Sequence, residues 1–238
     1  MPQSAAAAGT AVSAFSVHHV RHLSPTAFVV RFDRNRMQFA PGQYITVGIA
    51  GDLHVREYSI YSSPDDDFLE ILVKSVEGGL VSHKLQQLEQ GDSLQVEGPF
   101  GYFVLDEHST LTRQSEVSSA APAPVLMIAT GTGISPFHSM VSTNPEMPYT
   151  LLHGVRSAIE DYDWQRYTPG QLVRCITRDT DGTADFAGRV TDYLRQNPVT
   201  DPSTRCMLCG NCDMIYEVFD ILQEQGIPSQ QLYAEVYF

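Results

Sequence analysis

The stretch from Val125 to Pro136 reads VLMIATGTGISP and decides the fold of the second half of this chain. Its first five residues form a short apolar run of the kind that becomes a buried strand. Gly131 and Gly133 allow the backbone to approach a ligand closely, and Pro136 suits the first position of a helix. The sequence therefore predicts a strand, a nucleotide-phosphate loop and a helix, although the full Gly-x-Gly-x-x-Gly pattern is absent.

After this loop, apolar runs alternate with segments of helical pattern. That alternation predicts a parallel sheet covered on both faces by helices, with ligands bound at the carboxyl ends of the strands. The expected strands are residues 125–129, 149–154, 172–177, 205–209 and 232–236, and the expected helices are residues 136–142, 159–166, 189–196 and 214–225.

The first half of the chain, from Phe15 to about Val104, consists of short β-like runs separated by turn signals such as Pro41-Gly42. This pattern predicts an antiparallel barrel or sandwich with one helix, at residues 82–88. The clearest expected strands are residues 27–32, 43–49, 57–61, 68–76 and 93–96.

The stretch from Glu107 to Pro124 is rich in Ser, Thr, Ala and Pro and shows no periodicity, so it marks a boundary. We therefore expect four parts. They are a disordered tail over residues 1–14, an antiparallel β-barrel over residues 15–106, a linker or loop over residues 107–123, and an α/β parallel-sheet nucleotide-binding domain over residues 124–238.

Charge and composition limit the class of protein. The 238 residues carry 15 Lys and Arg against 28 Asp and Glu, a net charge of −13, which argues against nucleic-acid binding by bulk electrostatics. No apolar run approaches the roughly 18 residues of a membrane-spanning helix, and the first residues lack the basic and apolar regions of a signal peptide. We therefore expect a monomeric cytoplasmic protein.

Two segments of the first half carry side chains suited to a nucleotide. Residues 56–62 read REYSIYS on an expected strand and combine a guanidinium for a pyrophosphate, an aromatic ring and a hydroxyl. Residues 79–82 read GLVS before the expected helix, where backbone N–H groups and a Ser hydroxyl can bind an anion. Taken alone, each segment also fits an ordinary barrel strand or an ordinary helix cap.

Cys206, Cys209 and Cys212 have the C-x-x-C-x-x-C spacing of an iron–sulfur ligand set. However, residues three apart on a strand point to opposite faces, and the one remaining thiol, Cys175, lies on an interior strand. We therefore expect no metal site. Cys206 is interpreted as a core residue, and Cys209 as a thiol at the ligand-binding edge of the sheet.

The order of the motifs resembles ferredoxin–NADP reductase over nearly the whole chain, from Phe15 to Phe238, and its bacterial branch in particular. The segment Phe39–Tyr44 also resembles that family. The motifs are Arg56-x-Tyr58-Ser59-x-x-Ser62, Gly79-x-x-Ser82, Gly131-Thr132-Gly133-x-x-Pro136, Cys209-Gly210-x-x-x-Met214 and the terminal Glu235-Val236-Tyr237-Phe238.

The resemblance implies that the barrel binds FAD and the α/β domain binds NADP(H), with the two rings meeting between the domains. In the family, the residues matching Ser59, Cys209, Glu235 and Tyr237 surround the reacting carbons, and Tyr237 stacks on the flavin face that the nicotinamide must occupy. The implied FAD contacts are Arg56, Tyr58, Ser59, Ile60, Leu72, Val73, Lys74, Gly79, Leu80, Val81, Ser82, Tyr237 and Phe238. The implied NADP contacts are Thr130, Gly131, Thr132, Gly133, Pro136, Arg156, Thr177, Arg178, Arg189, Gly210 and Met214.

The implied activity is hydride transfer between NADP(H) and FAD, with single electrons passed to or from ferredoxin or flavodoxin. The cysteine spacing of a plant-type ferredoxin module is absent, so the carrier would be a separate protein. Since such carriers are acidic, a local basic patch is expected, and Arg34, Arg36 and Lys84 are the candidates.

Several alternatives stay open. A reductase component that feeds an oxygenase and a reductase of free flavins share the same architecture. A flavin-holding relay subunit of a larger complex is a further alternative, against which the Cys209-Gly210 motif and Glu235 argue, because a relay has little use for a nicotinamide pocket. The last alternative is an interaction module without flavin.

Overall fold

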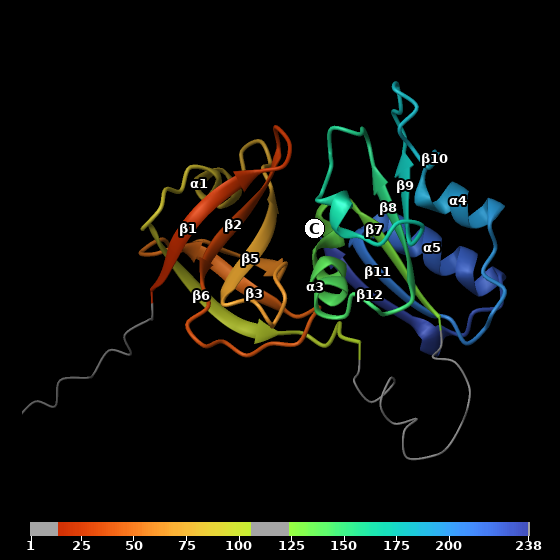
Figure 1. Ribbon diagram of the computed structural model, residues 1–238, viewed down its shortest axis with the longest axis horizontal. Helices are drawn as coiled ribbons and strands as arrows, with labels where there is room; N and C mark the ends of the chain where they lie inside the picture. The colour runs from red at the N-terminus through yellow and green to blue at the C-terminus, as the bar shows by residue number, and fades with distance from the viewer. Residues whose placement is uncertain (1–13, 106–123, 238) are drawn as a thin grey trace, which may run out of the picture.

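The computed structural model describes residues 14–105 and 124–237. Within these residues the chain forms two sheets of six strands each, which lie side by side with helix α3 between them (Figure 1). Residues 1–13 of the expected tail, the expected linker over residues 107–123, and Phe238 lie outside the described residues.

The first sheet is antiparallel, with strand order β4-β3-β6-β1-β2-β5. A bridge between Ile60 and Ile71 links the end of β4 to β5, so the two edges of the sheet meet and the predicted barrel is confirmed. The elements are β1 (Phe15–His22), β2 (Ala27–Asp33), β3 (Tyr44–Ile49), β4 (Val55–Ser59), β5 (Phe68–Lys74), α1 (Ser82–Gln86) and β6 (Ser93–Phe100).

The two faces of β2 show how the barrel is joined to the rest of the molecule. Phe28, Val30 and Phe32 alternate along the strand into the barrel core, as the two-residue repeat of a strand requires. Ala27 and Val29, on the opposite face, belong to a second cluster that also contains residues of the other sheet. The barrel therefore has one interior face and one face that packs against the second domain.

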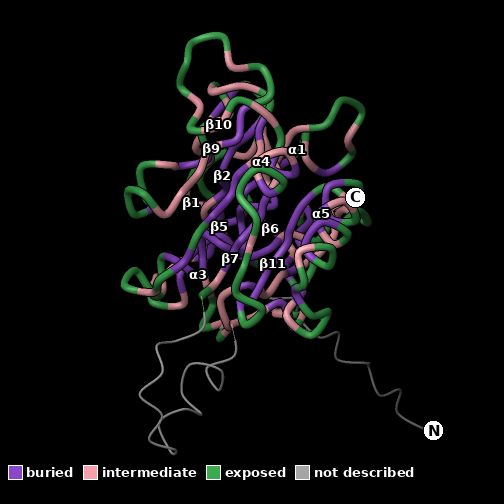
Figure 2. Tube along the Cα trace, turned by 90° about the vertical axis from the view of Figure 1, so that its right-hand side faces the viewer, coloured by how far each residue is buried: buried purple, intermediate pink, exposed green. Residues whose placement is uncertain are grey.

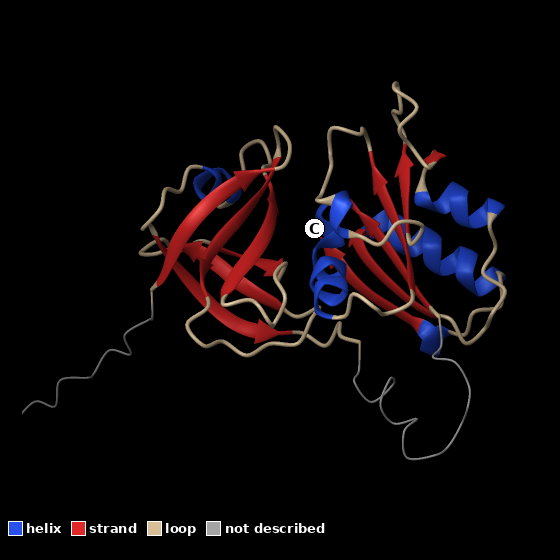
Figure 3. Ribbon diagram, in the orientation of Figure 1, coloured by secondary structure: helices blue, strands red, loops and turns tan. Residues whose placement is uncertain are grey.

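The second sheet is fully parallel, with strand order β10-β9-β8-β7-β11-β12, which confirms the predicted α/β architecture. Helices α4 and α5 cover one face, and α3 covers the face toward the barrel (Figure 3). The elements are β7 (Val125–Thr130), η1 (Gly131–Ile134), α3 (Ser135–Thr143), β8 (Tyr149–Val155), η2 (Trp164–Arg166), β9 (Leu172–Ile176), β10 (Phe186–Ala187), α4 (Val190–Gln196), β11 (Arg205–Asn211), α5 (Cys212–Glu224), η3 (Ser229–Gln231) and β12 (Leu232–Tyr237).

The helix expected over residues 159–166 is wrong. Only a single 3-10 turn forms there, at Trp164–Arg166, and Asp163 before it has a left-handed backbone with φ of 57°. The physical reason is tertiary: the side chains of Glu160 and Asp163 are held by cations of the barrel, and Tyr162 is fully buried. A regular helix could not make all of these contacts, so the segment is irregular.

Strands β2, β5, β7 and β11 are buried along most of their length (Figure 2). The cluster between the sheets combines Val29 and Leu72 of the barrel with Met127, Phe137 and Met140 of the second domain. The two domains thus share one continuous apolar interface, which fixes how their ligand-binding edges face each other. None of the helices in the described ranges has the length and hydropathy needed to span a bilayer.

Candidate active site between the two domains

A cavity of about 520 Å³ lies at the carboxyl ends of the parallel strands, where ligands bind in sheets of this type. Segments from the ends of β7, β8, β9, β11 and β12 meet there, and Lys74 reaches it from β5 of the barrel. Among the residues that line it are the predicted Thr130, Gly131, Thr132, Arg156, Thr177, Arg189, Gly210, Met214 and Tyr237.

Two glycines allow the loops after β7 and β11 to approach each other. A Cβ on Gly133 would lie 2.3 Å from the carbonyl oxygen of Cys209, and a Cβ on Gly210 would lie 2.4 Å from Oγ1 of Thr130. The same Thr130 oxygen accepts a hydrogen bond of 3.0 Å from the backbone N–H of Asn211. Because any side chain would separate these loops, the glycines form a narrow cradle at the floor of the cavity.

Charges of both signs line the cavity: the cations Lys74, Arg156 and Arg189, and the carboxylates Glu160, Asp213 and Glu217. Arg156 and Arg189 line its wall, and Lys74 forms an ion pair of 3.2 Å with Glu160. Burial raises the pKa of Glu160, but the Lys74 ammonium and the hydrogen bonds outweigh it, so the pKa lies below its ordinary value. With backbone N–H groups at the glycine loops, this donor set fits the phosphates of a dinucleotide.

The four residues predicted to act in catalysis meet at the edge of this cavity. The Tyr237 hydroxyl donates to Oγ of Ser59 over 2.5 Å, and the Ser59 hydroxyl donates to Oε2 of Glu235 over 3.3 Å. Cys209 and Glu235 are register partners on β11 and β12, and the Cys209 side chain contacts the Tyr237 hydroxyl. Ser59 belongs to the barrel and the other three to the second domain, so the cluster spans the domain interface.

Burial keeps most of this cluster neutral. It raises the pKa of the Cys209 thiol and of the Tyr237 hydroxyl well above their ordinary values. Burial also raises the pKa of Glu235 to about 7, against the lowering effect of the Ser59 hydrogen bond. Cys209 therefore remains a thiol near neutral pH, which disfavours a nucleophilic role, whereas Glu235 is poised to gain or lose a proton there.

We expect the Glu235→Gln variant to remove a pH dependence of stability. An acid whose folded pKa is raised binds more protons in the folded state, so the wild-type protein loses stability as pH rises from the ordinary carboxyl pKa to about 7. The expected loss is about 2 kcal/mol after an allowance for partial exposure. Denaturant unfolding at a series of pH values measures this loss. If the unfolding free energies of wild type and variant changed with pH in parallel, the raised pKa of Glu235 would be contradicted.

The barrel face for the other nucleotide lies on β4, an edge strand whose unpaired backbone groups are available to a ligand. Val55, Arg56 and Glu57 are exposed, Tyr58 is half-buried, and Ser59 is buried beside the catalytic cluster. Within the part of the chain that the structure describes, the Arg56 guanidinium donates one hydrogen bond, to the carbonyl oxygen of Val55, so its other N–H groups can bind a pyrophosphate. The donor set of this strand fits a flavin nucleotide.

The other FAD contacts predicted in the barrel differ in whether their side chains are buried or exposed. The side chains of Ile60, Leu72, Val73 and Val81 belong to the buried cores, so contacts from these positions to FAD would have to come from the backbone. Near α1, Ser82 Oγ accepts from the backbone N–H of Val76 over 3.4 Å, Gly79 packs closely against that loop, and Leu80 is exposed.

In the second domain, the predicted contacts divide into residues at the cavity and residues behind it. Thr177 lines the cavity, whereas Arg178 is exposed and lies beyond the lining residues. Pro136 is buried at the start of α3. Phe238 lies outside the described residues. These site assignments stay predictions.

Eight residues that line the cavity were not predicted from the sequence, Asn211 and Glu160 among them. Asn211 caps α5, since its side-chain oxygen accepts from the N–H of Met214 over 3.2 Å, and Asn before a helix is a readable capping signal. Glu160 had no such signal, because its role depends on Lys74, which is 86 positions away.

Of the three cations predicted to form a basic patch, Arg36 is exposed, whereas Arg34 and Lys84 have partners within the barrel; the patch itself stays a prediction. Arg34 donates to the carbonyl oxygens of Met37, Pro64 and Asp66, so its charge is used inside the barrel loops. Lys84 is paired with Asp52. The sequence could not show this, because the partners of both cations lie about 30 residues away.

Comparison with known families agrees with this geometry. The family described as oxidoreductase FAD-binding domain matches residues 15–105, and the family described as oxidoreductase NAD-binding domain matches residues 127–219. Among solved structures, a ferredoxin NADP+ reductase from Neisseria gonorrhoeae aligns with a TM-score of 0.80 and 22% identity, covering 95% of this chain and 98% of that one. That likeness shows a shared fold.

Two curated relatives illustrate the range of functions. A ferredoxin–NADP reductase of Azotobacter vinelandii is 28% identical to this chain, and the alignment covers 87% of this chain and 88% of that protein. The toluate 1,2-dioxygenase electron transfer component of Pseudomonas putida is 27% identical over 93% of this chain, which spans 66% of that relative's length. The chain thus contains an oxidoreductase FAD-binding domain followed by an oxidoreductase NAD-binding domain, and it is similar to ferredoxin reductases across both.

Proposed function

We propose that this protein is a ferredoxin–NADP reductase, which transfers a hydride between NADP(H) and bound FAD and exchanges single electrons with a separate ferredoxin or flavodoxin. The observation that carries the proposal is the cluster of Ser59, Cys209, Glu235 and Tyr237, built from both domains at the edge of the nucleotide cavity. A protein that only stored a flavin would not need this cluster beside a second nucleotide site.

The bound flavin supplies the conversion between electron pairs and single electrons. The residues of the chain supply position and polarity. Arg56 and β4 would hold the flavin nucleotide, and the Gly131–Gly133 loop with Arg156 would hold the phosphates of the second nucleotide. Ser59 and Glu235 present a hydroxyl and a carboxyl group that could hold a proton beside the reacting rings. The Tyr237 ring would lie beside the same groups.

The proposal includes a preference for NADPH over NADH. Arg156 and Arg189 line the cavity, and Arg189 also lines a smaller adjoining cavity with Thr177 and Asp192. An additional phosphate on the ribose would gain charge-assisted hydrogen bonds from these guanidinium groups. Among residues 14–105 and 124–237, no carboxylate forms an ion pair with either guanidinium group; the bond from Arg189 to Asp192 comes from the Arg189 backbone N–H.

We expect Arg189→Ala to weaken NADPH binding about tenfold while leaving NADH binding within about twofold, since a lost bond to a charged group costs about 1.4 kcal/mol or more. Titration of the oxidised protein with each nucleotide measures both dissociation constants. Arg174→Ala, whose guanidinium pairs with Asp185 over 2.8 Å away from the residues that line the cavity, is the control and leaves both constants unchanged. An equal loss for NADPH and NADH would place the 2′-phosphate elsewhere.

A reductase component of an oxygenase system is the second candidate function. Relatives that carry such names include components of toluate, naphthalene and terephthalate dioxygenase systems. The use of Arg34 and Lys84 in internal contacts also weakens the case for an acidic carrier at that surface. The carrier is therefore the main point on which the two candidates differ.

Anaerobic stopped-flow mixing tests the proposal. The purified protein is expected to be yellow, its flavin to be reduced faster by NADPH than by NADH, and the reduced protein to reduce ferredoxins or flavodoxins. Faster reduction of an oxygenase-type ferredoxin than of the other carriers would favour the second candidate. A colourless protein, or a flavin that neither nucleotide reduces, would refute both.

A further inference from the structure

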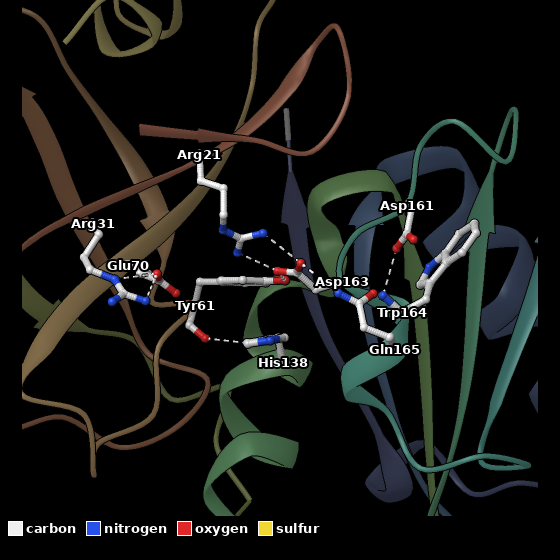
Figure 4. Close-up of polar contacts among 9 residues, drawn as sticks. All are labelled: Arg21, Arg31, Tyr61, Glu70, His138, Asp161, Asp163, Trp164 and Gln165. Atoms are coloured by element: carbon white, nitrogen blue, oxygen red, sulfur yellow. Dashed lines mark hydrogen bonds and ion pairs between the residues drawn. The ribbon is translucent and has the colours of Figure 1, made fainter. Parts of the chain in front are cut away.

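An arginine–carboxylate pair joins the two domains beside the active site. Arg21 of β1 donates from its two terminal nitrogens to the two carboxylate oxygens of Asp163, over 2.8 and 2.7 Å (Figure 4). The Asp163 side chain is 5% exposed, and its pKa lies below the ordinary value because the bonds to Arg21 outweigh the raising effect of burial. Such two-point pairs fix orientation as well as distance.

Tyr61 extends this contact to helix α3. Its hydroxyl donates to Oδ2 of Asp163 over 3.1 Å, and its ring stacks on His138 with centroids 3.7 Å apart and planes 11° apart. Nδ1 of His138 donates to the carbonyl oxygen of Tyr61 over 2.8 Å, and the Ser139 hydroxyl donates to the carbonyl oxygen of Ser62 over 2.7 Å. The backbone directly after β4 is thus fixed to the second domain.

Trp164, the residue after Asp163, extends the network to the glycine loop. An indole N–H can only donate, so its bond of 2.9 Å makes Nδ1 of His153 the acceptor. The other ring nitrogen of His153 then carries the proton and donates to the carbonyl oxygen of Gly131 over 2.9 Å. Gly131 has φ of 53°, a left-handed conformation that this bond helps to hold.

These contacts converge on both halves of the active site. Tyr61 lies two positions after Ser59, and His138 lies two positions after Pro136, at the end of the nucleotide loop. Asp163 itself holds a buried charge and a left-handed backbone, each of which is unfavourable without compensating contacts. Asp163 and Trp164 therefore link both domains. Asp163 accepts from Tyr61, which lies directly after β4, and Trp164 is connected through His153 to the loop at Gly131.

We propose that Asp163 is a positioning residue for hydride transfer, which, through Arg21, Tyr61 and Trp164, sets the alignment of Ser59 on the barrel with the Gly131 loop of the second domain. The proposal rests on the proposed function, because alignment has a kinetic consequence only if two nucleotide rings react between these elements. Asp163 touches no reacting atom in this scheme and acts through the backbone of its partners.

The first test is the Asp163→Asn variant, which keeps the side-chain shape and removes the charge. We expect the limiting rate of flavin reduction at saturating NADPH to fall about tenfold, because a small misalignment of reacting groups is costly, while FAD content and the NADPH dissociation constant change less than about twofold. Arg21→Met should show the same loss. Arg21→Lys, which restores the charge, should recover part of the rate.

The second test does not depend on activity. Hydrogen exchange of the FAD-loaded protein should show faster exchange of backbone amides within residues 60–63 and 131–139 in Asp163→Asn and Arg21→Met than in wild type. Arg31→Met is the matched control, since Arg31 pairs with the buried Glu70 over 2.8 Å within the barrel alone (Figure 4). This control should leave the exchange of residues 131–139 and the limiting rate unchanged.

Each outcome decides the proposal. Unchanged rates and exchange in Asp163→Asn and Arg21→Met, a loss confined to nucleotide binding, or an equal loss in Arg31→Met would overturn it. If Asp163→Asn does not fold, the comparison of Arg21→Met with Arg21→Lys gives the same decision. If wild-type flavin is not reduced by NADPH, the proposed function fails, and the exchange measurements still show whether Asp163 couples the two segments.

Discussion

Gly133→Ala is expected to reduce NADPH-dependent flavin reduction at least about 100-fold, although it adds only one methyl group. The added Cβ would lie 2.3 Å from the carbonyl oxygen of Cys209 and 2.7 Å from Cα of Gly210. Both are main-chain atoms of a central strand, and they cannot rotate away as a side chain could. The loops after β7 and β11 must separate, which moves the phosphate-binding loop and Cys209 together.

Stopped-flow reduction and nucleotide titration measure this effect, and FAD absorbance checks that the barrel site is intact. Gly154→Ala is the matched control on the same cavity, because its Cβ would meet side-chain methyl groups of Thr130 and Val190 at 3.1 Å, while the nearest main-chain atom, the Ala129 carbonyl oxygen, lies at an ordinary contact distance of 3.6 Å. We expect that control to lose less than about fivefold, since such groups can shift. Similar kinetics in both variants would show that the close approach of the two loops is unnecessary.

Ser59→Ala is expected to slow flavin reduction about 10- to 100-fold while FAD stays bound. The Ser59 hydroxyl accepts from Tyr237 and donates to Glu235, so its removal leaves both partners without this bond at the domain interface. The free Tyr237 hydroxyl and the Glu235 carboxyl group would then no longer be held in one arrangement beside the reacting rings. The effect is expected in the limiting rate rather than in the NADPH dissociation constant.

Ser62→Ala provides the comparison, because that hydroxyl belongs to the same motif but accepts from the backbone N–H of Glu70 over 3.0 Å. It should lower the unfolding midpoint and leave the rate of flavin reduction nearly unchanged. A Ser59→Ala protein that reduces its flavin at the wild-type rate would remove Ser59 from the catalytic group.

The fold could be predicted because its signals are local. Alternating apolar residues along segments such as 27–32 and the strand–loop–helix stretch from Val125 to Pro136 need only their immediate neighbours to form. The prediction was wrong over residues 159–166, where local pattern favoured a helix and contacts from the barrel favoured an irregular segment.

The candidate site shows the same contrast between residues with a local signal and residues whose role depends on a distant partner. The residue types at Ser59, Cys209, Glu235 and Tyr237 were readable as a set because their motifs resemble a known family, and β-strand register explains why Cys209 and Glu235 are neighbours. The roles of Asp163, Glu160 and Arg34 were not readable. Each depends on a partner between 30 and 142 positions away, and no local rule specifies which distant charge a side chain will meet.

The amino-acid sequence by itself determined the two architectures and the glycine loop, because strand alternation, capping and glycine conformations are properties of short segments; the groups that bind nucleotides it only predicted. Only the tertiary structure decided how the two sheets face each other. That relation depends on an apolar interface and on buried pairs such as Arg21 with Asp163, whose free energy exists only when distant segments have already come together.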